Sequence, residues 1–525
     1  MNVYKIIRTS GIALAIALSM NSCKKDYLDT KPSTQVPLED VFKTTAGAKT
    51  VLNGMHRRLY TSDDHDKFGL PSININYDLM GEDFGNSEAG LGWFNRAYSD
   101  AQNGDSYPWN IYYAIITNAN FILKNIDAAV GSEEERNEVK GQAYAYRGWA
   151  YLQLLQTYQM PYGGLGYVVD GGTGSGYGVY AKGTTPSDAL GVPLYTEPTK
   201  EAKPRASMRD VLTQIDSDLD ASIENFKKGS LGRGADKSQI NLNVAYGIKA
   251  RSALYQRKWT VAANLADSAR QGWTLSSGNT LLDGFNSTSA GEWMWGAHIN
   301  QEQNGIYGSF YSHLDPKLGG YADYDEKVVG SPLIRKMGGV DYSQDLDSND
   351  VRFHWWNPSS RTRWPGYEHL KFKSQLKFRT ISDASFAGDY PYMRVAEMYL
   401  IEAEGKALAN DLTGAATILE EFVKTRQPNY DVSAYNTKDL LVHEIWRQRR
   451  IELWGEGFRF FDAKRQMVQS TGVVPLSDIN RQPSGFYLGS EPIVVSPYTN
   501  YMYYLIPGNE ITNNNACLQN PPKIK

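Results

Sequence analysis

Apolar residues recur every three or four positions along much of the chain, the spacing that places side chains on one face of an α-helix. The clearest case begins at Ser132, a capping residue that precedes three glutamates. The apolar stripe that follows consists of Val139, Ala143, Tyr146, Ala150 and Leu154. Pro161 and Gly163 interrupt the pattern, so we predict one long amphipathic helix between Ser132 and this break.

Two later segments share an arrangement of small residues. Residues 253–254 and 407–408 both read Ala-Leu, and residues 262–263 and 415–416 both read Ala-Ala. Small residues that face each other across a short turn let two helices approach closely, as in tetratricopeptide-like hairpins. We therefore predict a mostly α fold, a tetratricopeptide-like scaffold of about four helix pairs. These pairs are expected near 40–128, 132–228, 243–271 and 392–426.

The pattern changes between about 272 and 390, where Gly, Asn, Asp, Trp and Tyr replace the helical runs. Such a composition indicates long loops and short strands inserted in the helical scaffold. In the sequence EWMW, alternation places Trp293 and Trp295 on one side of a short strand, so at least one is expected in the core. A C-terminal helix and tail are expected over 436–525, and residues 23–525 are interpreted as one domain.

The N-terminus has the features of a secretion signal over residues 1–22, with a positively charged start and an apolar run from Gly11 to Met20. That run is too short to span a membrane, which takes roughly 20 apolar residues. Cys23 follows directly, which predicts a lipid anchor on this cysteine. Ordinary secretion, or a disulfide with Cys517, are the alternatives.

Acidic and basic residues, 58 and 54 of them, are mixed along the chain and give a formal net charge of −4. No basic region is available to attract phosphates, so nucleic acid is not an expected partner. The seven histidines form no HExxH pair and only two cysteines are present, so we predict no metal site and no cofactor. Polar aromatics are abundant, with 35 Tyr and 12 Trp, and each combines a flat apolar face with a hydrogen-bonding edge.

Six stretches, taken together, resemble the SusD/RagB family. They are CKKDYLDTKP, YRGWAYLQLLQTYQMPYGG, GVPLYTEP, YMRVAEMYLIEAEGKA, IWRQRRIELWGEGFRFFDAKR and YYLIPGNEITNNNACLQNP. They occur in the family's order from Cys23 almost to the C-terminus, although Gln448 stands where the family often has Glu. The resemblance implies a non-catalytic, glycan-binding lipoprotein on the extracellular face of the outer membrane. It also implies a partner, a SusC-like TonB-dependent transporter on which the protein acts as a lid.

Glycan binding needs flat apolar faces that stack on sugar rings, together with planar amides and carboxylates that bind hydroxyls. The loop between the first pair of predicted helices supplies both kinds of group. The family resemblance places part of the glycan site in this loop. The expected contacts there are Asp83, Trp93, Phe94, Asn95 and Tyr98.

Two further loops carry candidate contacts. Residues 300–311 interleave Asn and Gln with aromatic residues and glycines, a mixture suited to sugar recognition and poorly suited to a core. In this segment we expect Tyr307 and Tyr311 to contact glycan. The aromatic loop FHWWNPSSRTRWPGYEH contributes Trp364 as a candidate, and the same loop is equally suited to face the transporter.

Two other functions remain open from the sequence. A scaffold that binds only protein would use the same Tyr and Trp, which are enriched at protein interfaces. A glycosidase would use Glu452 and Glu456, whose helical spacing puts their Cβ atoms roughly 5–6 Å apart. That spacing is close to the ~5–5.5 Å between the carboxyls of a retaining enzyme. Arg449 and Arg459 flank the pair, however, and cations lower a carboxylate pKa, so we predict a structural ion-pair face.

Overall fold

The protein is described by a computed structural model of the 525-residue chain. The described residues are 38–81, 83–86, 93–94, 101, 103–160, 162–163, 167–169, 177–179, 189–317, 319–329, 348–356, 375–381, 385–469 and 503–520. The predicted lipid anchor at Cys23 and the candidate contacts Asn95, Tyr98 and Trp364 lie outside these residues.

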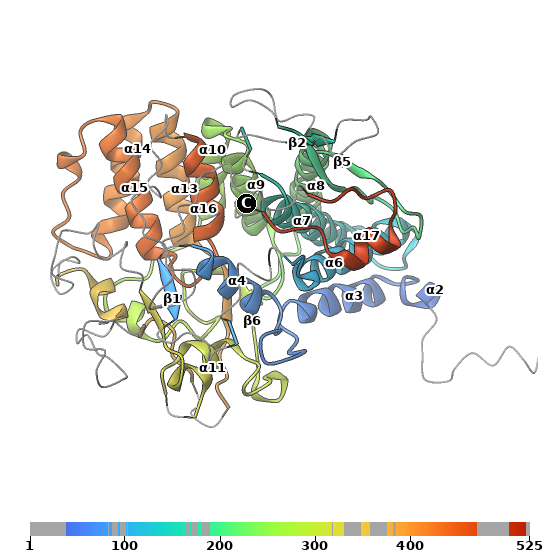
Figure 1. Cartoon of the computed structure of the whole chain (residues 1–525), viewed down its shortest axis with the longest axis horizontal. Helices are drawn as coiled ribbons and strands as arrows, with labels where there is room; N and C mark the ends of the chain where they lie inside the picture. Colours follow the sequence, from blue (N-terminus) through green and yellow to red (C-terminus); the bar gives the residue numbers. More distant parts are fainter. Residues whose placement is uncertain are drawn as a thin grey trace, which may run out of the picture.

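In the described part of the chain, four helix pairs form the scaffold. They are α3 (Thr45–Arg58) with α6 (Ser106–Asn125), α7 (Glu133–Tyr158) with α8 (Met208–Gly229), α9 (Leu242–Tyr255) with α10 (Trp259–Arg270), and α13 (Val395–Leu408) with α14 (Leu412–Lys424). Neighbouring pairs also touch, because α6 packs on α7, α8 on α9 and α10 on α13. The pairs therefore form one continuous helical array, as Figure 1 shows. The predicted scaffold of about four helix pairs is confirmed.

The helix α7 begins and ends with side-chain caps. The Ser132 hydroxyl accepts the Glu135 backbone N–H at 3.1 Å, and the Glu135 carboxylate accepts the Ser132 backbone N–H at 3.2 Å. This capping box satisfies two backbone donors that a helix start leaves free. At the other end, the buried Lys464 amine donates to the carbonyls of Gln156 and Gln159, the second at 2.8 Å. Burial holds the pKa of Lys464 well below its usual range, so these hydrogen bonds, rather than a full charge, cap the helix end.

Small residues allow two of the helix pairs to meet closely. A Cβ on Gly405 in α13 would lie 2.7 Å from the Trp259 carbonyl oxygen and 3.0 Å from the Ala263 Cβ in α10. No side chain fits in that space, so the contact between α10 and α13 depends on this glycine.

The described strands pair into four two-stranded antiparallel sheets. They are β1 (Phe84–Asn86) with β7 (Lys327–Val329), β2 (Tyr167–Val169) with β3 (Tyr177–Val179), β4 (Leu190–Pro193) with β5 (Arg205–Ser207), and β6 (Trp293–Ala297) with β8 (Tyr390–Arg394). All five residues of β6 are buried, so both Trp293 and Trp295 belong to the core. Because β8 runs directly into α13, this sheet attaches the inserted region to the scaffold.

The remaining described helices complete the fold. They are α2 (Leu38–Val41), α4 (Leu70–Leu79), α11 (Phe310–Leu314), α15 (Lys438–Glu452), α16 (Arg459–Gln469), α17 (Gly508–Asn513) and the 3-10 helices η2 (Ile126–Ala128), η4 (Gly278–Leu282), η5 (Gln301–Gln303), η6 (Tyr321–Asp323), η7 (Val351–Trp355) and η8 (Val432–Ala434). No helix in the described ranges is long and apolar enough to cross a membrane.

The predicted C-terminal helix is two helices, which corrects the expectation that Glu452 and Glu456 share one helical face. The helix α15 ends at Glu452, and α16 begins only at Arg459. Between them Gly455 and Gly457 have φ values of +78° and +85°, a left-handed conformation that breaks the helix.

Candidate functional site

Aromatic rings from four segments of the chain meet beside α11, and two of them are exposed. Trp93 follows β1, Tyr307 precedes α11 and Tyr321 begins η6, while His65 comes from the loop between α3 and α4. We call these four residues the aromatic platform. Trp93 is 44% exposed and Tyr307 is 48% exposed, values uncommon for such large rings. Figure 1 shows α11 on the side of the scaffold opposite α10 and α14.

The rings of the aromatic platform are held in a defined arrangement. The Trp93 ring lies parallel to the His65 imidazole, with centroids 4.9 Å apart and an interplanar angle of 6°. Tyr321 contacts both Trp93 and Tyr307, with ring centroids 6.2 Å and 5.7 Å apart. Two exposed rings that were 214 residues apart in the sequence are therefore joined through one tyrosine. Rigid, exposed ring faces of this kind suit stacking on the C–H face of a sugar.

Hydrogen bonds to neighbouring residues fix the rings of the aromatic platform. The Tyr321 hydroxyl and His65 Nδ1 are 2.6 Å apart. His313 Nε2 donates to the His65 carbonyl oxygen at 2.8 Å, and its ring stacks on Tyr321 at 4.8 Å. Burial, reinforced by the charge of Lys327, lowers the pKa of His313 to about 3. The imidazole is therefore neutral at neutral pH and supports the platform without introducing a charge.

This neutral histidine predicts an acid-sensitive stability. The pKa of His313 is about 3 in the folded chain, against 6.5 unfolded, so the unfolded chain binds more protons between those values. Stability is therefore lost as the pH falls below 6.5. The free energy of unfolding, measured with urea, should fall between pH 7.5 and pH 5 by about 2 kcal/mol more in the wild type than in His313→Gln.

His354, which is exposed, provides the matched control for that experiment. The His354→Gln variant should show the same pH dependence as the wild type. An equal pH dependence in the wild type and His313→Gln would show that His313 does not stay neutral in the folded chain.

Two predicted contacts in the first loop are buried, which corrects their assignment to a glycan surface. Asp83 is 2% exposed and accepts from Arg450 Nε at 2.8 Å, so its carboxylate serves an internal ion pair. Phe94 is also 2% exposed and packs edge-on against His313 and Phe68. Neither side chain is accessible to a polysaccharide.

Tyr311 is a third correction. Its side chain is 1% exposed, and its hydroxyl donates to the backbone carbonyls of Phe285 and Asp389, the second at 2.7 Å. The ring fits because Gly388 lies against it, where a Cβ would approach a ring carbon to 2.4 Å. Tyr311 is thus a core residue, and its neighbour Tyr307 is the exposed ring of this segment.

Sequence reasoning missed Tyr321 and His65. Tyr321 is one tyrosine in GGYADYDEK, and His65 is a single histidine in an acidic turn, SDDHDKF. Neither lies in a dense run of aromatic residues like those around Trp93 and Tyr307, so only the contact between distant loops identifies them. Trp93 and Tyr307 were expected and are exposed in this cluster; their contact with glycan stays a prediction.

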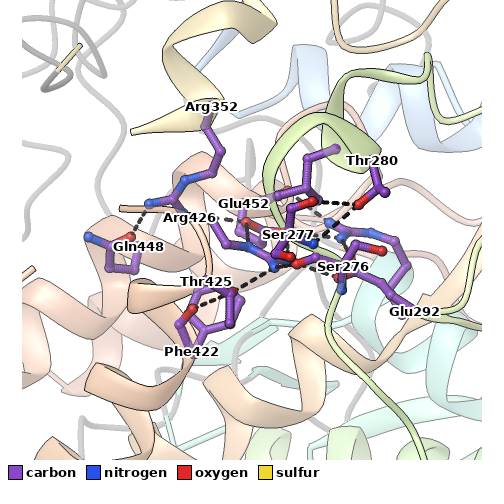
Figure 2. Close-up of polar contacts among 12 residues, drawn as sticks. Ser276, Ser277, Thr280, Glu292, Arg352, Phe422, Thr425, Arg426, Gln448 and Glu452 are labelled. Atoms are coloured by element: carbon purple, nitrogen blue, oxygen red, sulfur yellow. Dashed lines mark hydrogen bonds and ion pairs between the residues drawn. The ribbon is translucent and has the colours of Figure 1, made fainter. Parts of the chain in front are cut away.

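The carboxylates of the rival enzyme hypothesis lie in a buried ionic network, part of which Figure 2 shows. Glu452 is fully buried and accepts from Arg394 at 2.9 Å, Arg426 at 2.8 Å and Arg352 at 3.4 Å. Gln448, the departure from the family pattern, accepts from Arg352 at 2.6 Å and so belongs to the same network.

Glu456 has equally strong partners. Arg394 donates to both of its oxygens, at 2.7 and 2.9 Å, and Lys377 donates at 2.6 Å. Burial by itself would raise the pKa of Glu456, but the charges of Arg394 and Lys377 outweigh it and hold the pKa below its usual range. For Glu452, burial is likewise outweighed by Arg426 and Arg394, and the pKa lies well below normal.

A general acid needs a raised pKa and access to substrate, and neither glutamate has them. The structural ion-pair interpretation is confirmed, although its cations differ from those expected. Arg449 pairs instead with Asp462 at 2.7 Å, and Arg459 pairs with Asp83 at 3.2 Å.

A nearby cavity is too small for a sugar chain. It lies among Trp149, Tyr255 and Phe458 and has a volume of about 60 Å³. Pockets that enclose small organic ligands typically measure about 300–1,000 Å³. The exposed aromatic platform is therefore the better candidate for glycan binding.

Comparisons with known proteins agree with this architecture. A model of the SusD family matches residues 341–522, and a second family model, described as starch-binding and associating with the outer membrane, matches residues 26–251. SusD-like protein P2 of Formosa agariphila is 22% identical, over 97% of this chain and 98% of the relative.

Solved structures share the fold over most of the chain. A SusD-like carbohydrate binding protein from Bacteroides vulgatus is 28% identical with a TM-score of 0.73, covering 90% of this chain and 97% of its own. A SusD superfamily protein from the same species, 20% identical with a TM-score of 0.71, covers 92% and 100% and shows the fold alone. With two family models on either side of residues 252–340 and this shared fold, the chain belongs to the SusD-like proteins.

Proposed function

We propose that this protein captures oligosaccharide or polysaccharide at the cell surface by stacking sugar rings on the aromatic platform. Membership of the SusD-like proteins implies carbohydrate binding in association with the outer membrane. The observation that carries the proposal is that exposed Trp93 and exposed Tyr307 both pack against Tyr321. This arrangement offers several ring faces on one surface.

The affinity should be modest because each stacking contact is weak. An open platform leaves one side of the sugar in water, so little of the ligand surface is buried. We expect dissociation constants from micromolar to millimolar, roughly −8 to −4 kcal/mol.

The proposed function is glycan binding without cleavage. The glutamates at the spacing of a glycosidase pair are buried and ionised by Arg394, Arg426 and Lys377. Captured glycan would then pass to a SusC-like TonB-dependent transporter, while a lipid on Cys23 holds the protein at the extracellular face of the outer membrane. The family resemblance supports both the transporter and the anchor.

A glycan-binding screen tests the proposed function. The soluble chain beginning after Cys23 would be titrated calorimetrically with maltoheptaose, cellohexaose, xylohexaose, oligogalacturonate and a heparin-derived hexasaccharide, with product analysis of each mixture. Binding without products is the expected result. Products would revive the enzyme hypothesis, and the absence of binding to any glycan would favour a scaffold that binds only protein.

A further inference from the structure

The turn that carries Tyr307 contains a strained residue. Gly308 N–H donates to the Gly305 carbonyl at 3.1 Å and closes the turn, with Ile306 and Tyr307 at its tip. Ile306 has a φ of +51°, in the left-handed region. A β-branched residue rarely adopts that conformation, because its side chain crowds the backbone, and glycine or asparagine is the usual occupant.

The surrounding structure prevents this turn from relaxing. A Cβ on Gly305 would lie 2.1 Å from Ser62 Oγ, and one on Gly308 would lie 2.6 Å from the Asp64 carbonyl oxygen. The backbone at both ends of the turn therefore lies directly against the loop that also carries His65, without room for a side chain. Ser309 Oγ donates to the Ile306 carbonyl at 2.5 Å and fixes the strained peptide itself. Such strain persists only where neighbouring contacts impose it, and it concentrates at ligand sites.

Burial of the Ile306 side chain does little to offset this strain. Ile306 is 45% exposed, close to the 48% of Tyr307 beside it. A glycine at this position would remove the strain, and an asparagine would reduce it. Folding alone therefore does not account for an exposed aliphatic side chain here, next to the aromatic platform.

We propose that Ile306 is a specificity-determining contact that extends the aromatic platform and favours neutral glycans. This inference rests on the proposed function. The side chain offers apolar surface for the C–H face of a sugar and has neither charge nor hydrogen-bonding group. A sulfate or carboxylate placed against it would lose water without gaining a partner, which is unfavourable.

Two substitutions test this role because they separate strain from binding. Ile306→Gly and Ile306→Asn both suit a left-handed backbone and remove the aliphatic surface. Each should raise the thermal unfolding midpoint relative to the wild type. Each should also weaken binding of a neutral oligosaccharide by about 5-fold, because the apolar contact between part of the isoleucine side chain and the sugar is lost. The ligand tested is maltoheptaose, cellohexaose or xylohexaose, whichever the wild type binds.

Val261→Asn is the matched control, since Val261 is also 45% exposed and lies on α10, across the scaffold from α11 (Figure 1). It should leave glycan affinity unchanged. Oligogalacturonate and the heparin-derived hexasaccharide supply the anionic comparison and should bind the wild type more weakly than the neutral ligand.

The outcomes distinguish this inference from the proposed function. If Trp93→Ala weakens binding while both Ile306 variants bind like the wild type, the platform stands and the role of Ile306 is wrong. Unchanged unfolding midpoints would remove the strain argument, and stronger binding of the anionic ligands would overturn the assigned class. A wild type that binds none of these glycans would refute the proposed function, and this inference with it.

Discussion

Replacing Arg394 by methionine is expected to lower the free energy of unfolding by about 3–5 kcal/mol. Arg394 is 1% exposed and donates to Glu292, Glu452 and Glu456. Methionine has a similar length but no charge, so three buried carboxylates would lose a shared cation. Removing one partner of a buried ionic network leaves uncompensated charge, which costs more than the intact network contributes. Urea unfolding followed by circular dichroism measures the change.

The same substitution should make the protein more sensitive to acid. In the wild type, Glu452 and Glu456 have folded pKa values below their ordinary values, through Arg426, Arg394 and Lys377. Their stabilisation is present above the unfolded pKa of about 4.3 and is lost as pH falls toward the folded pKa. Without Arg394 those folded pKa values rise, so the acid unfolding midpoint should move to higher pH.

A surface ion pair provides the control for this prediction. Lys49 lies 3.2 Å from Glu135, and its side chain is 42% exposed. Lys49→Met should cost less than about 1 kcal/mol, because water screens exposed pairs. If the methionine variant does not fold, Arg394→Lys can be measured in its place, because lysine keeps the charge but lacks the planar guanidinium that binds several carboxylates at once. A loss below 1 kcal/mol in Arg394→Met would show that the network is not needed for stability.

The helical scaffold was predictable because its signals are local. The stripe beginning at Val139, the Ser132 cap and the repeated small residues each depend on residues close together in the sequence, and the structure has α7 and the paired helices there. Gly455 and Gly457 carried a local signal too, in WGEGF, but the family-like run IWRQRRIELWGEGFRFF was interpreted as continuous helix. Their positive φ values end that continuity.

The site was only partly predictable because its geometry depends on contacts between distant loops. Aromatic residues among glycines indicated Trp93 and Tyr307, but the same composition also surrounds Tyr311. Whether a ring is exposed depends on its partner, and Tyr311 is buried because Gly388, 77 positions later, accepts its ring. Tyr321 joins the two exposed rings for the same reason, through a contact that no local pattern encodes.

Replacing Trp93 by alanine is expected to weaken glycan binding by about 10- to 100-fold, or roughly 1.4–2.7 kcal/mol. The indole is the largest exposed ring of the aromatic platform, and the His65 imidazole stacked 4.9 Å behind it holds it in place. Its removal eliminates one stacking face and frees His65. Because Trp93 is 44% exposed, the free energy of unfolding should change little. Isothermal titration with the glycan identified by the screen measures the affinity.

Two further variants show whether the effect belongs to the platform. Tyr321→Phe keeps the central ring but removes the hydroxyl 2.6 Å from His65 Nδ1, so it should weaken binding less than Trp93→Ala. Leu440→Ala removes an apolar side chain of similar exposure, 48%, on α15 and should leave affinity unchanged. If Trp93→Ala binds as tightly as the wild type, the rings around Tyr321 are not the glycan site. Asn95, Tyr98 and Trp364, the remaining predicted contacts, would then be the next candidates.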